Sequence, residues 1–138
     1  MSRTPPPTEA EAGALLDHAR RVAGQAYAPY SRFRVGAVAV VGEGVYEGVN
    51  VENAAFASTI CAEANALTTA ATAGVRRVPV IAVGCLDADE CTPCGNCRQI
   101  MREFSVEWIV FQGQGGRVRL SRLDDLLPES FGPASLPG

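Results

Sequence analysis

VPVIAVGC, residues 78–85, is a continuous apolar run near the middle of the chain. A strand with one face in water alternates polar and apolar side chains, whereas a strand that is covered on both faces does not. We therefore expect this run to form a central strand in a sheet that carries helices on both faces.

The segments on either side of this run have the composition of helices. Residues 60–73 are rich in alanine and threonine, and Ser58 or Thr59 is placed to cap their first turn. Residues 94–104 form another predicted helix, and the apolar run at residues 106–111 predicts a further strand. A strand followed by a helix and another strand is typical of an α/β domain.

The N-terminal part predicts a helix followed by a hairpin. Thr8 and Glu11 have the spacing of a capping box, and apolar residues recur at helical intervals through residues 9–26. Residues 33–41 and 45–51 are apolar and rich in valine and are separated by a glycine turn, so they predict two paired strands.

The C-terminal part adds three small predicted elements: a turn at residues 113–116, an edge strand at residues 117–120 and a short helix after residues 121–124. The complete order predicts one α/β domain over residues 8–132, with a central mixed sheet flanked by helices. We expect a flexible tail at residues 1–7 and a second tail at residues 133–138.

Composition and charge disfavour several classes of protein. The chain has 138 residues, of which 47% are hydrophobic and 20% are charged, as in an ordinary globular domain. Twelve basic and fifteen acidic residues give a net charge of −3, which disfavours a protein that grips a nucleic-acid backbone or an anionic membrane. The opening residues lack the apolar segment of a secretory signal, and no apolar run is long enough to span a bilayer. We expect a cytoplasmic protein whose cysteines stay reduced.

The five cysteines are an odd number, so they cannot all form pairs within one chain. Cys61-Ala62-Glu63 opens one predicted helix, and Pro93-Cys94-Gly95-Asn96-Cys97 opens the other. Free amides and the positive dipole end at a helix N-terminus favour thiolates. Three thiolates that converge from two helix starts would hold Zn²⁺ with one position left for water, and the Glu63 carboxylate could then move protons at that water.

The two motifs together are typical of zinc-dependent nucleobase deaminases, which carry a Cys or His two residues before a Glu, and a later Pro-Cys-x-x-Cys. An alternative is a closed structural zinc site with Cys91 as the fourth ligand, but such a site would leave Glu63 without a role. We expect Cys91 to be a loop thiol and Cys85 to be a buried apolar residue at a strand end. Trp108 is expected in the core, and His18 on the polar side of the first helix.

Further segments match one family: Tyr27–Ala37, Asn50–Ala55, Cys97–Gln99 and Leu126–Phe131. Together with the cysteine motifs, they resemble the small homotetrameric cytidine deaminases of the cytidine and deoxycytidylate deaminase superfamily, over residues 10–132. The resemblance implies a three-layer α-β-α fold with a five-stranded mixed sheet. It also implies a nucleoside substrate and a homotetramer in which active sites are shared between subunits.

The resemblance implies a metal centre with one Zn²⁺ per subunit. Cys61, Cys94 and Cys97 would be its ligands, Glu63 would be the catalytic proton shuttle, and Arg98 would lie beside the ligand sulfurs. The implied reaction is the hydrolytic deamination of cytidine or deoxycytidine to uridine or deoxyuridine, with release of ammonia.

The resemblance also implies a set of substrate-binding residues. Phe33 would pack against the base, Asn50 and Glu52 would hydrogen-bond the ribose hydroxyls, and Ala62 would contact the substrate. Phe131 would reach into the pocket of a neighbouring subunit and stack there. Taken without the resemblance, the two phenylalanines would be assigned to core packing, and Asn50 and Glu52 to turn chemistry and solvation.

The sequence departs from the family at two positions. Ala64 follows Glu63 where the family has arginine, and Phe56 stands where the family usually has tyrosine. Zn²⁺ with three thiolates already carries a net negative charge, which weakens it as a Lewis acid, so a lost arginine matters there. Since the motif without arginine also resembles blasticidin-S deaminases, a modified cytosine nucleoside or another aminated heterocycle is the alternative substrate to cytidine.

Two other functional classes are alternatives to a nucleoside deaminase. A deaminase that edits polynucleotides would need a basic groove and exposed aromatic side chains, and the net charge of −3 with 7% aromatic residues gives no such footprint. A zinc-stabilised interaction protein without catalysis would bind zinc but release no ammonia from any nucleoside.

Overall fold

The computed structural model describes residues 3–137 and contains one five-stranded sheet. Its strands are β1 (Val35–Val41), β2 (Gly44–Val49), β3 (Val80–Cys85), β4 (Trp108–Gln112) and β5 (Val118–Arg122). Their order across the sheet is β2-β1-β3-β4-β5, with β3 and β4 parallel and the other neighbouring pairs antiparallel. The apolar run at residues 78–85 therefore supplies the middle strand of a mixed sheet, as predicted.

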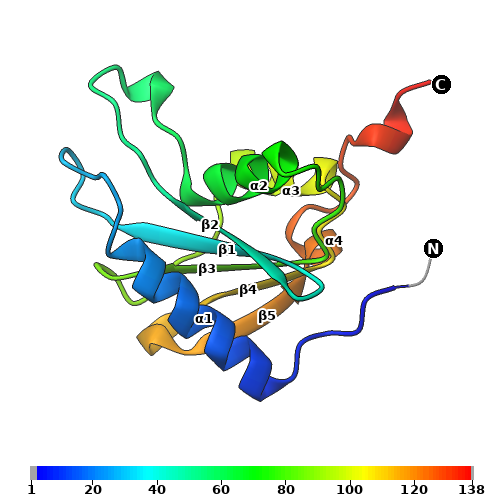
Figure 1. Cartoon of the computed structure of the whole chain (residues 1–138), viewed down its shortest axis with the longest axis horizontal. Coiled ribbons are helices and arrows are strands. Elements are labelled where there is room, and N and C mark those ends of the chain that lie inside the picture. Colours follow the sequence, from blue (N-terminus) through cyan, green and yellow to red (C-terminus); the bar gives the residue numbers. More distant parts are fainter. Residues whose placement is uncertain (1–2, 138) are drawn as a thin grey trace.

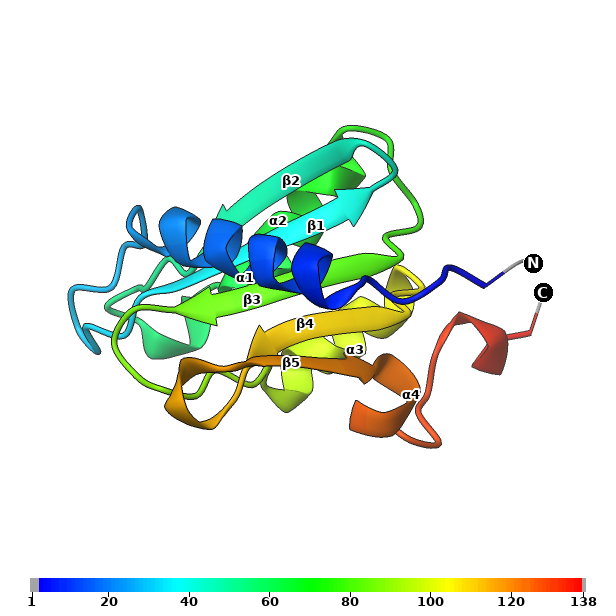
Figure 2. The same cartoon turned by 90° about the horizontal axis from the view of Figure 1, so that it is seen from below.

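Helices cover both faces of this sheet. On one face lies α1 (Glu9–Ala23), and on the other lie α2 (Ala62–Thr72) and α3 (Gly95–Glu103), as Figures 1 and 2 show. The short α4 (Leu123–Leu126) follows β5. This arrangement confirms the predicted three-layer α/β fold. None of the helices within residues 3–137 is long and apolar enough to cross a membrane.

The pleat of the sheet divides the core between the two helical layers. Ala37 and Ala39 of β1 belong to the core on the side of α2 and α3, whereas Val38 between them packs with Leu16 and Ala19 of α1. Successive side chains of a strand point to opposite faces, so β1 contributes to both layers.

The predicted capping box at the start of α1 is present. The Glu11 amide donates to the Thr8 hydroxyl at 3.1 Å, and the Thr8 amide donates to the Glu11 carboxylate at 2.9 Å. The helix ends before Gly24, earlier than predicted. The chain leaves the helix there because the Tyr27 amide donates to the Asn50 carbonyl beyond β2.

The prediction that Ser58 or Thr59 caps α2 is wrong, because Cys61 occupies the N-cap position. Ile60 is still paired with Val51 through two backbone hydrogen bonds of 2.9 and 3.0 Å. The chain therefore stays extended up to the residue before Cys61, and the helix begins at the motif itself.

Trp108 is half-buried, so the prediction of a core position is wrong. Its indole N–H donates to the Thr4 carbonyl at 2.9 Å, and the Arg122 guanidinium lies over its ring, 5.4 Å from the ring centroid. His18 lies on the polar side of α1, as predicted, with Nε2 2.6 Å from a carboxylate oxygen of Glu47.

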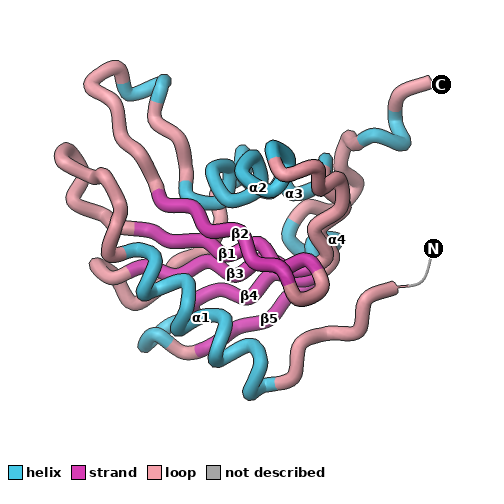
Figure 3. The backbone as a smooth tube through the Cα atoms, viewed as in Figure 1, coloured by secondary structure: helices cyan, strands magenta, loops and turns pink. Residues whose placement is uncertain are grey.

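The long loops gather at one end of the sheet. The loop before β1, the loop after β2 and the loop after β3 lie at this end, whereas the described parts of both termini lie toward the other end (Figure 3). The loops after β2 and β3 lead directly into α2 and α3, so the two helices start near the same end.

Two glycines let the helices approach the sheet closely. A Cβ atom on Gly48 of β2 would lie 2.3 Å from the Ala66 amide nitrogen and 2.6 Å from the Ala62 carbonyl oxygen of α2. On the opposite face, a Cβ atom on Gly36 of β1 would lie 2.1 Å from the Ala19 carbonyl oxygen of α1. These atoms belong to helix backbone, so a side chain at either glycine must push a helix away from the sheet.

We predict that Gly48→Ala lowers the free energy of unfolding by about 1–3 kcal/mol, because the added methyl group overpacks the contact with α2. Urea unfolding followed by circular dichroism measures this change. The matched control is Gly13→Ala in α1, where no heavy atom lies within 4 Å of the added Cβ. This control should gain about 0.5–1 kcal/mol through helix propensity, and equal losses in both variants would contradict the packing argument.

Candidate metal centre

Three cysteine side chains converge at the starts of two helices. Cys61 is the N-cap of α2, Cys94 is the N-cap of α3, and Cys97 lies in the first turn of α3. Their Sγ atoms all lie within 4.8 Å of one another. The structure therefore brings together the three cysteines that the motif spacing predicted as ligands.

Local hydrogen bonding favours thiolates at this point. The Cys97 amide donates to Cys94 Sγ at 3.5 Å, and two helix N-termini direct their positive dipole ends toward the sulfurs. A hydrogen bond with the Cys97 thiol lowers the pKa of Cys61 to about 6, and the same hydrogen bond raises the pKa of Cys97. Cys61 is thus a thiolate at neutral pH.

The three sulfurs fit a zinc ion. Zn–S bonds of about 2.3 Å in a tetrahedron place the sulfurs about 3.8 Å apart, within the span that the Sγ atoms already occupy. Three soft thiolate ligands with an open fourth position are a ligand set that zinc accepts at catalytic sites.

Cys91 and Cys85 lie outside this group. Cys91 is buried and exchanges backbone hydrogen bonds with Gln112, and burial raises the pKa of its thiol far above the ordinary value. Its sulfur is not among the Sγ atoms that lie within 4.8 Å of one another, which argues against Cys91 as a fourth zinc ligand. Cys85 is fully buried at the end of β3, as predicted, and its thiol lies 3.3 Å from the Ala88 carbonyl oxygen.

Glu63 is the second residue of α2 and is 5% exposed. Burial raises the pKa of its carboxyl group to about 7. A carboxyl group that titrates near neutral pH is suited to take and return a proton. Its place one turn from the sulfurs is the place that the motif predicted for a proton shuttle.

A cavity of about 460 Å³ opens beside the sulfurs. Its wall includes seven of the residues predicted for the site: Phe33, Asn50, Glu52, Cys61, Ala62, Glu63 and Cys94. The wall also includes Cys91 and residues that were not predicted for the site, among them Ser31, Thr59, Glu90 and Thr92. The size and the mixture of apolar and polar groups suit a small polar molecule with an aromatic part.

Asn50 and Glu52 are held in place by the backbone that precedes β1. Asn50 accepts a hydrogen bond from the Val35 amide at 2.9 Å and donates one to the Phe33 carbonyl at 2.8 Å. Glu52 accepts from the amides of Tyr30 and Ser31 at 2.9 and 3.0 Å. Both side chains are therefore fixed parts of the cavity wall. This arrangement goes beyond the turn chemistry and solvation to which they would be assigned without the resemblance.

Ser31 is a site residue that the sequence reasoning missed. Its hydroxyl donates to the Glu52 carboxylate, and its hydrogen bonds hold the pKa of Glu52 below the ordinary value. A serine in a loop carries no signal by itself, because its partner is distant in sequence.

Gln112 is a second missed residue. It is buried at the end of β4, and its amide group donates to the carbonyls of Ala88 and Asp89 at 2.9 and 2.8 Å. These bonds shape the loop between β3 and α3, which carries the second half of the cysteine motif. A lone glutamine at the end of an apolar run was the available signal.

Phe131 and Arg98 do not face the cavity in the single chain. Phe131 is 60% exposed, so core packing is excluded for it, and its carbonyl accepts from the Gln99 side chain at 2.8 Å. The Arg98 guanidinium donates to the carbonyls of Pro93 and Leu126, both at 2.8 Å. These two hydrogen bonds of Arg98 go to backbone oxygens and fix the start of α3 against the C-terminal segment.

The two positions that depart from the family pattern do not line the cavity. Ala64 is half-buried in the first turn of α2. Phe56 is 77% exposed and packs edge-to-face against Tyr30, with ring centroids 6.1 Å apart. Neither residue supplies a hydrogen-bonding side chain at these places.

The comparisons with known proteins agree with this site. The family model of the cytidine and deoxycytidylate deaminase zinc-binding region matches residues 10–112. The cytidine deaminase of Mycobacterium tuberculosis (strain H37Rv) is 40% identical over 126 residues, which cover 89% of this chain and 91% of that protein. The cytidine deaminase of Halalkalibacterium halodurans is 39% identical over 120 residues, covering 85% of this chain and 91% of that protein.

The fold agrees as well. The crystal structure of cytidine deaminase from Burkholderia pseudomallei superposes with a TM-score of 0.79 at 41% identity, covering 86% of this chain and 98% of that one. Both cysteine motifs and the strands β1 to β4 lie within residues 10–112, which the family model matches. The chain belongs to the cytidine deaminase family of the cytidine and deoxycytidylate deaminase zinc-binding superfamily.

Proposed function

We propose that the protein is a zinc-dependent aminohydrolase that converts cytidine or deoxycytidine to uridine or deoxyuridine and ammonia. One observation carries this proposal: the Cys61, Cys94 and Cys97 group opens, together with buried Glu63, into a cavity large enough for a nucleoside. Family membership at about 40% identity over most of the chain supports it.

Zn²⁺ held by Cys61, Cys94 and Cys97 supplies, when bound, an activated water at neutral pH. Glu63 would accept one proton of the attacking water and deliver it to N3 of the pyrimidine. It would then take the remaining proton from the oxygen that has bonded to C4 and pass it to the exocyclic amine, which leaves as ammonia as the C4–N bond breaks. One carboxyl group is enough because it returns every proton that it takes, and a pKa of about 7 suits both directions.

The remaining wall of the cavity binds the nucleoside. Asn50 and Glu52 hydrogen-bond the ribose hydroxyls, since each retains acceptor or donor capacity beyond the bonds that fix it. Phe33, which is 36% exposed at the cavity, packs against the base, and Ala62 contacts the base from the start of α2. Arg98 acts indirectly, by fixing the backbone of Pro93 beside the ligand Cys94.

A modified cytosine nucleoside of the blasticidin-S type is the second candidate substrate. The observation that favours it is the departure from the family pattern at Ala64 and Phe56, neither of which carries a hydrogen-bonding side chain. The anchored Asn50 and Glu52 favour an ordinary ribose, so cytidine and deoxycytidine come first.

The active unit is a homotetramer in which Phe131 of one subunit stacks in the cavity of another. Exposed apolar side chains support this proposal, because they surround the loops that form the cavity mouth: Tyr27, Tyr30, Phe56 and Ile60. Large exposed apolar patches mark interfaces. Since the three ligand cysteines must stay reduced, the protein works in a reducing compartment such as the cytoplasm.

The activity is tested with cytidine, deoxycytidine and blasticidin S, by release of ammonia and change in absorbance. Cytidine or deoxycytidine should give the highest kcat/KM. Glu63→Gln should keep its zinc and lose at least about 100-fold in kcat, because the proton shuttle is removed. Zinc without ammonia from any nucleoside would contradict the proposed function, and an active Glu63→Gln enzyme would contradict the role of Glu63.

The metal centre is tested by the zinc content of purified variants after dialysis. Cys94→Ala should lose its zinc, because a ligand is removed. Cys91→Ala should keep about one zinc per chain, because its thiol lies outside the ligand group. Loss of zinc from both variants would favour the closed four-cysteine site instead.

The shared active site is tested by mixing two variant chains, one with weakened substrate binding and one without activity. Phe131→Ala should raise KM by about two- to tenfold through lost stacking, and Glu63→Gln should be inactive. Hybrids assembled from both variants should recover low KM, because each Glu63 then meets a Phe131 from the other chain. Hybrids whose KM stays at the Phe131→Ala value would show that Phe131 serves its own chain.

A further inference from the structure

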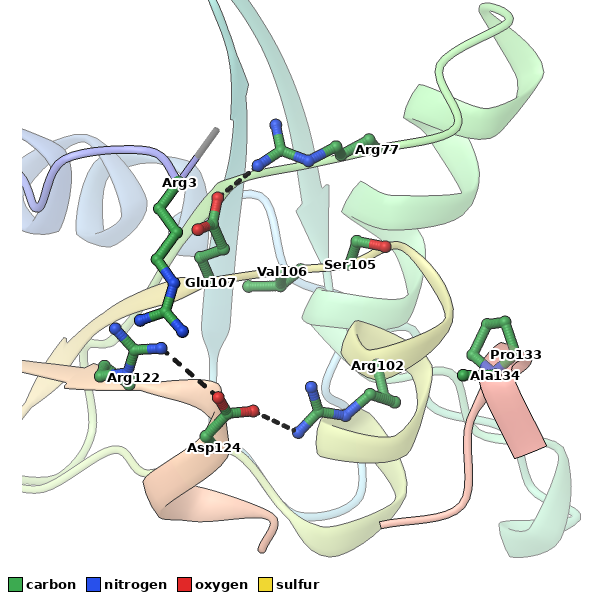
Figure 4. Close-up of a pocket in the computed structure, with 10 residues that line it drawn as sticks. All are labelled: Arg3, Arg77, Arg102, Ser105, Val106, Glu107, Arg122, Asp124, Pro133 and Ala134. Carbon is green, nitrogen blue, oxygen red and sulfur yellow. Dashed lines mark hydrogen bonds and ion pairs between the residues drawn. The ribbon is translucent and has the colours of Figure 1, made fainter. Parts of the chain in front are cut away.

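A second cleft lies at the opposite end of the sheet from the cysteines and is lined by four arginines. Its volume is about 390 Å³. Its charged lining consists of four arginines and two acids: Arg3, Arg77, Arg102, Arg122, Glu107 and Asp124 (Figure 4). Arg102 lies in the last turn of α3, whereas the ligand cysteines lie at the first turn. The cleft is therefore distinct from the nucleoside cavity.

The cleft has an excess of positive charge in an acidic protein. Arg77 pairs with Glu107, and Arg102 and Arg122 share Asp124 at 3.0 and 3.4 Å (Figure 4). Hydrogen bonding from Arg102 lowers the pKa of Asp124, so this acid is ionised at neutral pH. Four guanidinium groups thus face two carboxylates, whereas the whole chain has a net charge of −3.

Within residues 3–137, Glu107 and Asp124 form ion pairs with the other three arginines of the cleft and none with Arg3. Within residues 3–137 its guanidinium makes no ion pair, and in Figure 4 it points toward the guanidinium of Arg122. Two guanidinium groups that point toward each other repel unless an anion lies between them. The fork of donors on each group matches the oxygens of a tetrahedral anion.

The backbone at Arg3 is held in place because its neighbour Thr4 makes several hydrogen bonds to the rest of the protein. The Thr4 amide donates to both carboxylate oxygens of Glu107 at 3.2 and 3.1 Å. The Thr4 hydroxyl accepts from Arg77 at 3.2 Å, and its carbonyl accepts from Trp108 at 2.9 Å. Although residues 3–7 form no helix or strand, these bonds fix the backbone next to Arg3 at the rim of the cleft.

Arg122 has donors to spare. Its contact with Asp124 uses one terminal nitrogen at 3.4 Å, and its plane lies over the Trp108 ring. A guanidinium group carries five N–H donors, so most of those on Arg122 remain for a ligand. The hydroxyl of Ser105 also lines the cleft and can donate to an anion.

We infer that this cleft binds an oxyanion of the phosphate class, either free phosphate or the phosphate group of a small ester, between Arg3 and Arg122. The inference goes beyond the proposed deaminase activity and does not rest on it. A single cleft of this size suits one small anion, and the overall negative charge disfavours a nucleic-acid backbone.

Isothermal titration calorimetry with inorganic phosphate tests this site, at an ionic strength held constant with sodium chloride and on the zinc-loaded protein. Phosphate should bind with saturable heat. The double variant Arg3→Gln/Arg122→Gln should weaken its affinity at least about tenfold, because charge-assisted hydrogen bonds are lost. Arg3→Gln alone should weaken it in the same direction, and this variant touches no ion pair that supports the fold.

The matched control is Arg117→Gln, which removes the same charge from an exposed position outside the cleft and should change the affinity by less than about twofold. Ribose 5-phosphate distinguishes the two sources of phosphate: tighter binding than phosphate identifies an ester as the ligand, and equal binding identifies the free ion. Absence of saturable binding, or an affinity that Arg3→Gln and Arg117→Gln change equally, would overturn the inference.

Discussion

The close packing of α2 against β2 is the contact on which the rest of the site depends. Gly48 lets the backbone of α2 approach the sheet, so the start of that helix, with Cys61 and Glu63, lies opposite the start of α3. Because β3 and β4 are parallel, α3 must run back along the sheet between them, and its first turn returns to the same end. The topology therefore brings the two halves of the motif together. Neither half alone supplies all three cysteines of the metal centre.

The electrostatics of the site follow from this arrangement. Three cysteine side chains and a buried carboxyl group are placed together without an arginine side chain at position 64, and the Arg98 guanidinium is engaged by backbone carbonyls. The positive charge that favours these thiolates comes from the two helix N-termini. Burial raises the pKa of the Glu63 carboxyl group to about 7. Hydrogen bonds from Ser31 lower the pKa of Glu52 in the same cavity, so Glu52 is ionised at neutral pH. Two carboxyl groups in one cavity thus have different protonation behaviour because their surroundings differ.

Much of this could be predicted from the sequence. The apolar run at residues 78–85 and the two cysteine motifs carry local signals, so the middle strand, the layers and the convergence of the three cysteines were predicted correctly. The cap of α2 and the place of Trp108 were not, because the pairing of Ile60 with Val51 and the contact with Thr4 are made between distant segments. The roles of Ser31 and Gln112 were missed for the same reason, because their hydrogen-bond partners are distant in sequence. The position of Phe131 relative to another subunit is likewise a property of an assembly and stays a prediction.

The proposed metal centre has three cysteine ligands and one position left open beside Glu63. X-ray absorption spectroscopy at the zinc edge of the purified protein measures the atoms bound to the zinc ion. We expect three sulfur neighbours at about 2.3 Å and one lighter neighbour at about 2.0 Å. Four sulfur neighbours would contradict it, because Cys91 would then complete a closed site and Glu63 would have no water to act on.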